Sequence, residues 1–390
     1  MNNRINILFL NWHFTIGGVE TATCSLINNF NVNNIFNVFV LTFKGGVLLE
    51  KLPQDLNIGY LSPLPHENIN GKMFNLKNIP FFIIILLKLC KYIKVNKIDV
   101  IHTMDPLSYF IASVACRVTG IKHIRTQPNF IRTKERLNAK TFKWTPFAKW
   151  TDFFITYQFY ARDDLHKLGV PLNKIYVQKN RFDIRKNIET PITSDIRKEF
   201  GWDKNVKIVC SMSRLVRGKG LETFVEMIPH VVKEYKNVKF LILGEGPIKE
   251  ELIERCKELG VYSYVLFPGF RVDKENIAKQ VTLGVYPTAD TAGMADIPIY
   301  GNVLISKYSE AMEDYIVDRK TGYLIRGDDP IDYAKAVITL LEDDILREEM
   351  QKNLVAFYSD YEQGYFKNSI GMKELEGIII NLVNDNKKRS

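Results

Sequence analysis

The sequence has few cysteines, and their spacing argues against two kinds of site. Only five occur in 390 residues, at positions 24, 90, 116, 210 and 256, and no two are two or three positions apart. An odd number without close pairs argues against a disulfide framework and against a zinc site. The usage suits a reducing cytoplasm.

Long apolar runs are missing as well. The longest, residues 79–87, is far shorter than the roughly 18–20 apolar residues that a helix needs to cross a bilayer. Residues 1–5 lead into a strand-like stretch without the apolar core of a signal peptide. We therefore expect neither a transmembrane helix nor a signal peptide.

Acidic residues are scarce in the first half of the chain. Residues 1–190 contain 25 Lys and Arg against 12 Asp and Glu, a net charge of +13, whereas residues 191–390 contain 28 against 32, a net charge of −4. The overall charge of +9 suggests a polyanionic partner such as nucleic acid, a phosphorylated ligand or an anionic membrane. The basic character belongs to the N-terminal half alone.

Two segments about 200 residues apart share one pattern. Apolar runs at residues 5–10 and 206–210 are each followed by a loop with glycine and then by apolar residues at helical spacing. A buried parallel strand, a loop and a helix N-terminus open a Rossmann-like domain. Strand-like and helical segments alternate through both halves, which predicts an α/β protein with a parallel sheet in each half.

This pattern predicts three parts of the chain. A Rossmann-like domain is expected at residues 1–185 and a second at residues 186–365, with the linker between them near residues 184–200, where polar residues and Pro191 interrupt the pattern. The terminal segment, residues 366–390, contains a helix that can pack back on the N-terminal domain.

Residues 213–220 are the best local candidate for an anion site. They follow a strand and open a helix, whose first backbone N–H groups favour an anion. Arg214 and Lys219 add two cations, one able to grip phosphate oxygens as a fork and one acting as a point charge. Together they could neutralise a diphosphate; a basic surface loop is the alternative interpretation.

Short motifs follow one another along the chain from residue 5 to about residue 350. They lie at residues 17–20, 99–102, 180–183, 213–220, 243–247, 259–260, 265–269 and 318–324. Taken in this order, these motifs resemble the retaining glycosyltransferases of family four. The resemblance implies the GT-B fold, in which two Rossmann-like domains have parallel sheets that face each other across a cleft.

The resemblance assigns catalytic roles to three residues. Arg214 and Lys219 would hold the diphosphate of a nucleotide sugar in the C-terminal domain and stabilise it as it leaves. His102 matches a family position at a strand end that faces the cleft. A buried histidine with satisfied hydrogen bonds is the alternative for His102.

Donor-binding residues are implied in both domains. Gly17 and Gly18 would let the backbone of the N-terminal domain, the acceptor domain, approach the donor, because a side chain there would collide with it. In the second domain, which would bind the nucleotide sugar, Gly244 lies in a family motif. Phe270 and Arg271 would lie near the base.

Residues 286–306 depart from the family. Its Glu-x7-Glu signature is missing: either about four residues are absent, or Asp296 takes the second acidic position, and the sequence leaves both alignments open. Asp290 and Asp296 could substitute as donor-binding carboxylates, with N-capping or loop solvation as the alternative. Glu310, after the next strand, could approach the sugar or the phosphate.

The implied reaction moves a sugar, with retention, from a nucleotide sugar to a surface-polysaccharide or lipid-linked glycan acceptor, and a UDP-sugar is favoured. No Asp-x-Asp triplet occurs in the sequence, so neither a divalent metal nor another cofactor is implied. The altered region motivates a second hypothesis, a degenerate GT-B protein that binds a nucleotide sugar or a partner enzyme without turnover.

A basic surface is expected in the N-terminal half. Residues 78–97 join the apolar run to four lysines, a pattern typical of a helix at an anionic membrane interface, although a core helix with a basic end would look similar. Arg117, Lys122 and Arg125 are expected to continue this surface. The resemblance favours a membrane over nucleic acid. We therefore expect a cytoplasmic protein, peripheral on the inner face of the cell membrane.

Overall fold

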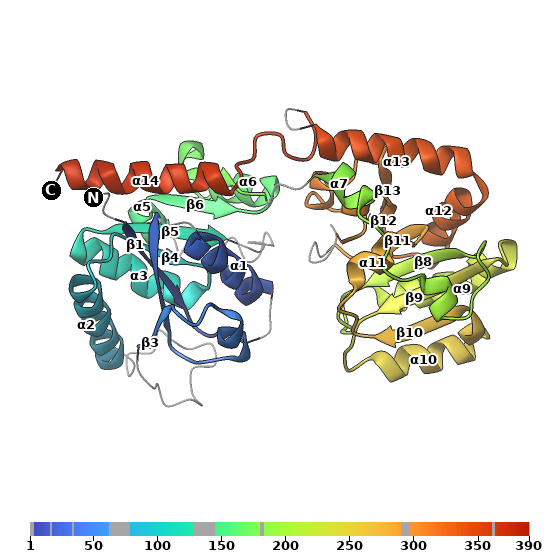
Figure 1. Cartoon of the computed structure of the whole chain (residues 1–390), viewed down its shortest axis with the longest axis horizontal. Helices are drawn as coiled ribbons and strands as arrows, with labels where there is room; N and C mark the ends of the chain where they lie inside the picture. The colour runs from blue at the N-terminus through green and yellow to red at the C-terminus, as the bar shows by residue number, and fades with distance from the viewer. Residues whose placement is uncertain are drawn as a thin grey trace. The chain divides into compact units, whose positions relative to one another are not determined.

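The structure is a computed structural model that describes residues 4–15, 18–32, 35–61, 79–127, 145–179, 183–289, 296–360 and 363–389. It divides into two compact units, each considered by itself (Figure 1). The first consists of Met1–Asn180 and Ser369–Ser390, and the second of Arg181–Asn368. The boundaries expected from the sequence, at residues 185 and 365, lie within a few residues of these.

The first unit contains a seven-stranded sheet in the order β3-β2-β1-β4-β5-β6-β7, and every strand pair is parallel. The strands are β1 (Ile5–Asn11), β2 (Phe36–Thr42), β3 (Asn57–Tyr60), β4 (Val100–Thr103), β5 (Lys122–Gln127), β6 (Phe153–Thr156) and β7 (Ile175–Val177). The helices are α1 (Gly18–Val32), η1 (Val47–Lys51), α2 (Ile79–Val95), α3 (Pro106–Thr119), α5 (Thr145–Trp150), α6 (Phe159–Lys167), η4 (Leu172–Lys174) and α14 (Met372–Arg389).

Helices cover both faces of this sheet. Along β1, Ile7 and Phe9 belong to a core shared with α1 and α14, while Leu8 and Leu10 belong to a core shared with α2 and α3. Side chains alternate between the faces of a strand, so a sheet buried on both sides needs apolar residues at successive positions. This explains why the sequence of β1 is a continuous apolar run.

The C-terminal helix α14 belongs to the first unit. Leu375, Ile379 and Val383, four positions apart along one face of the helix, are buried in the same core as β1. The segment before α14 pairs with β7, since the Ile370 N–H donates to the Val177 carbonyl at 2.8 Å. Residues from the end of the sequence therefore complete the N-terminal core.

The second unit contains a six-stranded parallel sheet in the order β10-β9-β8-β11-β12-β13. The strands are β8 (Lys207–Met212), β9 (Val238–Leu243), β10 (Val265–Gly269), β11 (Leu283–Tyr286), β12 (Val303–Lys307) and β13 (Gly322–Ile325). The helices are α7 (Ile184–Glu189), α8 (Ile196–Glu199), α9 (Leu221–Glu234), α10 (Lys249–Glu258), η5 (Tyr262–Tyr264), α11 (Lys274–Ala278), η7 (Pro298–Tyr300), η8 (Met312–Asp314), α12 (Pro330–Glu342) and α13 (Asp344–Ser359).

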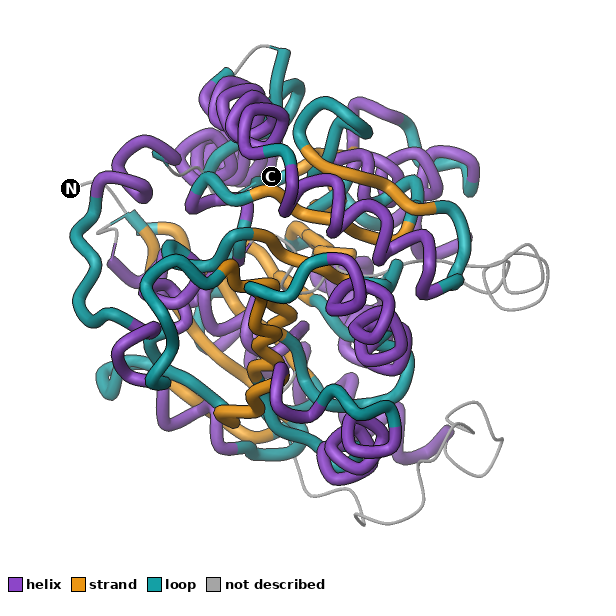
Figure 2. The backbone as a smooth tube through the Cα atoms, turned by 90° about the vertical axis from the view of Figure 1, so that its right-hand side faces the viewer, coloured by secondary structure: helices purple, strands orange, loops and turns teal. Residues whose placement is uncertain are grey.

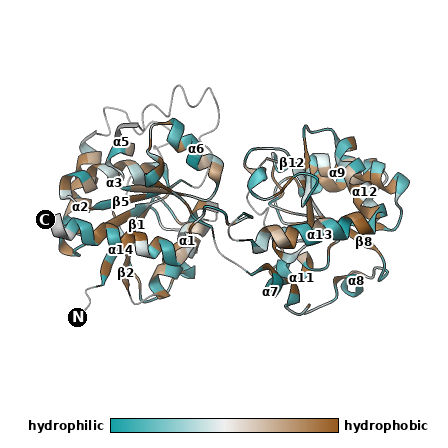
Figure 3. Cartoon of the chain, turned by 90° about the horizontal axis from the view of Figure 1, so that it is seen from above, coloured by the Kyte–Doolittle hydropathy of each residue, from teal (hydrophilic) through white to brown (hydrophobic). Residues whose placement is uncertain are grey.

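Two cores sandwich this second sheet. Val209 of β8 packs with α9, α10 and α12, whereas Ile208 and Cys210 pack with α7, α8, α11 and α13. Strands run through the interior and helices surround them (Figure 2). Hydrophobic residues concentrate on the strands, and hydrophilic residues on the outer helix faces (Figure 3). The two sheets confirm the prediction of an α/β protein with two Rossmann-like domains.

All five cysteines are free, and four of them are buried. Burial raises the pKa of the Cys116 and Cys210 thiols well above the usual value, so both behave as apolar core residues. Among the described residues, no helix is both long enough and apolar enough to cross a membrane.

Candidate functional site

The candidate anion loop lies at the carboxyl edge of the second sheet, between β8 and α9. In open α/β sheets this edge is where ligands bind. The Ser213 N–H donates to the Leu243 carbonyl at 3.0 Å, and the Leu215 N–H donates to the Glu245 carbonyl at 2.9 Å. These two hydrogen bonds hold the loop against the end of β9 and the residues that follow it.

Two glycines allow this close packing. Gly220 has a φ of +72°, and a Cβ there would lie 2.0 Å from the Pro287 carbonyl oxygen. Gly244 has a φ of +138°, and its Cβ would lie 1.9 Å from the Ser213 carbonyl oxygen. No side chain fits at either position, so the loops after β8, β9 and β11 pack backbone to backbone. For Gly244 the geometry shows a packing role.

The cations of the loop differ in their surroundings. The Arg214 side chain is exposed and forms no hydrogen bond or ion pair with any residue that the structure describes. Arg217, which sequence reasoning passed over, is bonded to both carboxylate oxygens of Glu251 at 2.8 Å and lies 3.4 Å from Glu222. Arg214 therefore carries an uncompensated charge, and Arg217 does not.

Lys219 and the start of α9 complete the loop. Lys219 is buried, with 9% of its surface exposed, directly before the N-cap residue Gly220. Gly220 offers no side chain to cap the N-terminus of α9, and no other side chain that the structure describes does so. The first N–H groups of a helix need acceptors and carry a partial positive charge. Arg214 and the helix start together favour an anion at this edge.

Phe270 and Arg271, after β10, lie in different environments. The Phe270 side chain is 74% exposed and available for stacking. Arg271 is bonded to Asp273, with Nε 2.7 Å from Oδ1, and to Glu199. These hydrogen bonds raise the pKa of Arg271. The guanidinium is thus committed to two carboxylates, and contact with a nucleotide base stays a prediction.

The connection between β11 and β12 contains the predicted carboxylates. Asp290 lies outside the described residues. Asp296 forms an ion pair with Lys274, with 2.8 Å between Oδ2 and Nζ. In the described part of the connection, residues 287–289 and 296–302, the helical structure is the three-residue η7. Asp296 is thus held by a neighbouring lysine at its present position.

Glu310 follows β12 at the same edge. Its side chain is exposed and has no bonded partner among the described residues. The preceding residue, Ser309, has a buried hydroxyl that lacks a hydrogen-bond partner in the described part of the chain. This turn therefore has unused polar groups, a feature that the sequence did not indicate for Ser309.

His102, in the first unit, is buried at the carboxyl end of β4. Its Nε2 lies 2.8 Å from Oγ1 of Thr126, and its ring packs on Phe9 with 4.9 Å between centroids. Burial, together with the Arg125 charge, lowers the pKa of His102 to about 3. Nδ1 is buried without a partner among the described residues. The ring is neutral at physiological pH and can act as a hydrogen-bonding group.

Arg125 corrects an expectation from the sequence. It does not continue a basic surface but is buried, 5% exposed, at the end of β5. Its guanidinium donates to Gln127 Oε1 at 2.8 Å and to the Asp105 carbonyl at 3.2 Å, and it lies over the Tyr109 ring. Arg117 is exposed as expected, and Lys122 is half-buried beside Asp152.

One of the two glycines predicted to approach the donor lies at the start of α1. Gly17 falls outside the described residues, and Gly18 is the first residue of α1. The neighbouring Trp12 N–H donates to Asp105 Oδ2 at 2.9 Å, and Asp105 Oδ1 caps α3. Where the structure describes the chain, no group of three or more His, Cys, Asp or Glu side chains is arranged to hold a metal ion.

Solved structures define the class of fold. The HepE protein of Anabaena, in complex with UDP, matches with a TM-score of 0.76 and 17% identity over 97% of this chain and 100% of that chain. A glycosyltransferase from Rickettsia africae ESF-5 matches with a TM-score of 0.76 and 14% identity over all of both chains. The fold is the GT-B fold.

Two family models give the family. Residues 192–355 match the model of the glycosyl transferases group 1, and residues 16–186 match the model of Glycosyltransferase Family 4. Between them they cover most of both units. The chain belongs to the group 1 glycosyltransferases, as the sequence motifs predicted.

Curated relatives match over varying shares of the chain at 25–28% identity. A Staphylococcus aureus poly(ribitol-phosphate) alpha-N-acetylglucosaminyltransferase is 28% identical over 39% of this chain, and an uncharacterized Methanocaldococcus jannaschii glycosyltransferase is 25% identical over 60%. The chain spans only 33% and 63% of the length of these two relatives. A Campylobacter jejuni alpha-1,4-N-acetyl-D-galactosaminyltransferase, named for a diphospho-undecaprenol-linked GalNAc acceptor, is 26% identical over 90% of this chain and 93% of its own length.

Proposed function

We propose that the protein transfers a sugar, with retention, from a nucleotide sugar to a surface-polysaccharide or lipid-linked glycan. Family membership supports the transfer of a glycosyl group. The acceptor class is supported by the names of the Campylobacter and Staphylococcus relatives, and a UDP-sugar donor by the UDP held in the HepE structure.

The anion loop of the second unit is the observation that carries this proposal. A leaving nucleoside diphosphate develops negative charge as the bond to the sugar breaks. Arg214 faces solvent without a counter-charge, and the uncapped α9 N-terminus points its N–H groups at the same edge. Fixed positive groups of this kind stabilise a leaving anion without reorganisation at the moment of reaction. No metal is required by such a site.

In this proposal, His102 has a different role. A ring whose pKa is about 3 carries no proton to donate as an imidazolium at neutral pH. We assign it a positioning role at the end of β4, where Nε2 is held by Thr126 and the neutral ring packs on Phe9. Glu310, which has no bonded partner among the described residues, is assigned to a donor hydroxyl, because Asp296 is paired with Lys274.

The test is a panel of nucleotide sugars, each scored for release of the nucleotide with and without EDTA. We expect one UDP-sugar to be turned over, and EDTA to leave the rate unchanged. The anomeric configuration of the product, read by NMR coupling constants, should match that of the donor. Inversion, or loss of the rate in EDTA, would contradict those parts of the proposal.

The short η7 favours a second candidate, a GT-B protein that binds a nucleotide sugar without turnover. The described residues between β11 and β12 show a three-residue helix and a paired Asp296. Tight binding of a nucleotide sugar by calorimetry, with no release of nucleotide for any donor and acceptor extract, would favour this candidate over the enzyme.

We further propose that the protein attaches to an anionic membrane on its cytoplasmic side through α2. The outer face of α2 exposes Ile83, Ile84 and Leu87, the last with 64% of its surface exposed. Exposed lysines follow on the same helix and just beyond it: Lys88, Lys91, Lys94 and Lys97. Apolar and cationic side chains on one helix face suit the interface of an anionic bilayer.

A further inference from the structure

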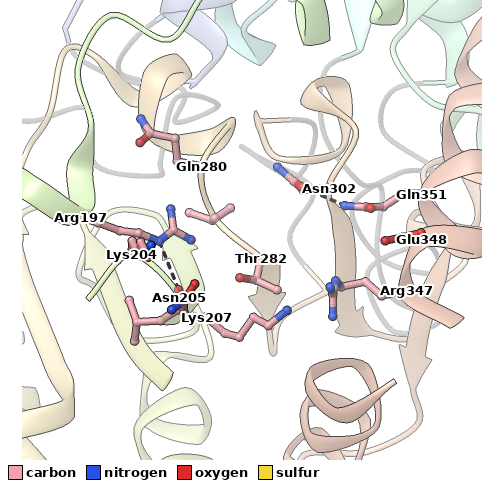
Figure 4. A pocket seen from close by; sticks show the side chains of 12 residues that line it. Arg197, Lys204, Asn205, Lys207, Gln280, Thr282, Asn302, Arg347, Glu348 and Gln351 are labelled. Atoms are coloured by element: carbon pink, nitrogen blue, oxygen red, sulfur yellow. Dashed lines mark hydrogen bonds between the residues drawn. The ribbon is translucent and has the colours of Figure 1, made fainter. Parts of the chain in front are cut away.

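A second concave site lies in the second unit, away from the anion loop. A pocket of about 450 Å³ opens where β8, β11 and β12 begin (Figure 4). The anion loop lies where the strands end. A six-residue strand such as β8 spans about 20 Å. One small ligand therefore cannot occupy both sites.

The walls of this pocket are unusually basic for their half of the chain. Residues 191–390 have a net charge of −4, yet four cationic side chains and a single carboxylate line the pocket. The charged lining residues are Arg197, Lys204, Lys207, Arg347 and Glu348. The local charge is thus opposite in sign to that of the surrounding half.

One wall is partly neutralised. Lys207 Nζ lies 2.8 Å from Asp344 Oδ1, and Arg347 is bonded to the same carboxylate. These two hydrogen bonds lower the pKa of Asp344. Arg347 also donates to the Leu340 carbonyl at 2.7 Å, which fixes the guanidinium while 8% of the residue remains exposed.

The cations of the opposite wall form no ion pair with any residue that the structure describes. Arg197 donates its Nε to the Val206 carbonyl at 3.2 Å and forms no ion pair with a described residue. Lys204 is exposed and forms neither a hydrogen bond nor an ion pair with the described part of the chain. Burial lowers the pKa of Arg197, and this shift is opposed by the charge of Asp195, whose Oδ1 accepts from the Arg197 backbone N–H at 2.9 Å. A half-buried guanidinium without a paired anion is costly, and a bound anion offsets that cost.

The rest of the pocket is rigid and polar. Asn302 donates to the Ala278 carbonyl at 2.7 Å and accepts from Gln351 at 3.2 Å. Gln280 donates to the Ser194 and Asn276 carbonyls. Because these amides are held by the fold, the pocket is formed before any ligand arrives. The side chains of Arg197 and Lys207 extend toward the same space (Figure 4).

We propose that this pocket binds a phosphate-bearing anion, with Arg197 and Lys204 gripping the phosphate and Lys207 and Arg347 on the facing wall. A guanidinium fork suits paired phosphate oxygens. The volume lies within the roughly 300–1,000 Å³ of small-molecule sites. It therefore admits pyrophosphate, a sugar phosphate or a nucleotide. The pocket does not depend on the proposed transfer reaction.

Opposite charge changes in the pocket provide the test. Pyrophosphate is titrated into the full-length protein by calorimetry. Lys204→Glu should weaken binding at one site by about tenfold or more, and Glu348→Gln should strengthen it severalfold. Both positions are exposed, so folding should be preserved. Arg197→Gln should weaken binding as Lys204→Glu does.

Two variants separate this pocket from other sites. Lys233→Glu removes an 80% exposed lysine of α9 and should leave binding at the pocket unchanged. Arg214→Ala should abolish pyrophosphate binding at the anion loop and leave binding at the pocket unchanged. The proposal is overturned if Lys204→Glu and Glu348→Gln both bind as the wild type does, or if Arg214→Ala removes all binding.

A second titration identifies the source of the phosphate. Long-chain polyphosphate at equal phosphate concentration should bind no more tightly than pyrophosphate if the ligand is a small molecule. Much tighter binding that is still lost in Lys204→Glu would assign the pocket to the phosphates of a polymer. Binding of either anion that Lys204→Glu leaves intact contradicts the pocket.

Discussion

At the residue scale, two arginines three positions apart in the same loop have different electrostatic surroundings. Arg217 is held by Glu251 and Glu222, while Arg214 has no partner among the described residues. A cation already paired with carboxylates adds little field at a leaving phosphate. The difference makes Arg217 a matched control for Arg214.

We predict that Arg214→Ala lowers kcat/KM by about 10²–10³-fold, the usual effect of removing one group that stabilises a developing anion. Arg217→Ala should change kcat/KM by only a few fold, because its charge is already compensated. Nucleotide release at saturating acceptor measures both, and thermal denaturation should give similar Tm values. Equal losses in the two variants would mean that the general charge of the loop acts, rather than Arg214.

Gly244 and Gly218 form a second matched pair, whose alanine variants are compared by their free energy of unfolding. Both have positive φ, but a Cβ at Gly244 would strike the Ser213 carbonyl, whereas nothing lies within 4 Å of a Cβ at Gly218. We predict a loss of about 2–4 kcal/mol for Gly244→Ala and about 1 kcal/mol for Gly218→Ala, measured by urea unfolding. Similar losses would show that the loops can separate freely.

Two buried histidines predict a pH dependence. Burial lowers the pKa of both His102 and His123 to about 3, with Arg125 adding to the effect, whereas an unfolded histidine titrates near 6.5. Below pH 6.5 the unfolded chain binds protons that the folded chain does not. The contribution of the two neutral histidines to the free energy of unfolding is therefore complete above pH 6.5 and is lost as the pH falls toward 3.

At pH 5.5 we expect each ring to cost about 1.4 kcal/mol of unfolding free energy relative to neutral pH. His123→Gln should remove about half of the combined effect when urea unfolding is compared at pH 7 and pH 5.5. His230→Gln, at an exposed position of α9, is the control and should keep it. A pH dependence unchanged in His123→Gln would mean that the imidazole protonates within the fold.

At the element scale, the sequence predicted strands and glycine loops better than charged side chains. Residues 5–10 were predicted as a strand because they are continuously apolar, and β1 is Ile5–Asn11. Strand and loop patterns are local in sequence. The partners of an arginine are not local: Arg271 bonds to Glu199, 72 residues away, and Arg125 to the backbone of Asp105. Neither pairing leaves a periodic signal.

In the candidate site, too, local patterns could be predicted from the sequence and non-local contacts could not. Residues 213–220 could be identified because they combine a strand end, glycines and three cationic residues. The structure adds what holds them, which depends on Pro287 and Glu245 from other strand ends. Likewise, the histidine of β4 could be identified, but its loss of basicity follows from burial and from the unforeseen Arg125.

The exposed face of α2 predicts binding to anionic vesicles. Each lysine near an anionic surface contributes about 1 kcal/mol. The triple variant Lys88→Gln, Lys91→Gln and Lys94→Gln should therefore bind about 100-fold more weakly in a sedimentation assay. Vesicles of neutral lipid should retain little of either protein.

The matched control removes three exposed lysines of the second unit, at positions 233, 257 and 335, and should bind like the wild type. If the two triple variants lose binding equally, total charge rather than α2 governs the attraction. If neither loses binding, α2 is not the membrane-binding helix.

At the scale of the whole molecule, the two units differ in which segments of the chain form them. The second is one continuous segment, whereas the first needs residues from both ends of the chain. The N-terminal half of the sequence has the more basic net charge, but this does not translate fully into a basic surface on the first unit. One of its arginines, Arg125, is buried. Stability of the first unit must depend on α14, whose buried face completes its core.

Removal of residues 369–390 therefore should destabilise the first unit alone. Leu375, Ile379 and Val383 are each at most 1% exposed, and losing three such side chains costs about 6 kcal/mol or more by burial alone. Hydrogen exchange should accelerate in β1 and β4, which pack beneath α14, while β8 and β9 exchange as in the intact chain. A shorter deletion of residues 384–390, after Val383, keeps the buried face and is the control. Equal protection of β1 in the two truncated proteins would mean that the sheet is stable without α14, and faster exchange in β8 would mean that the two units unfold together.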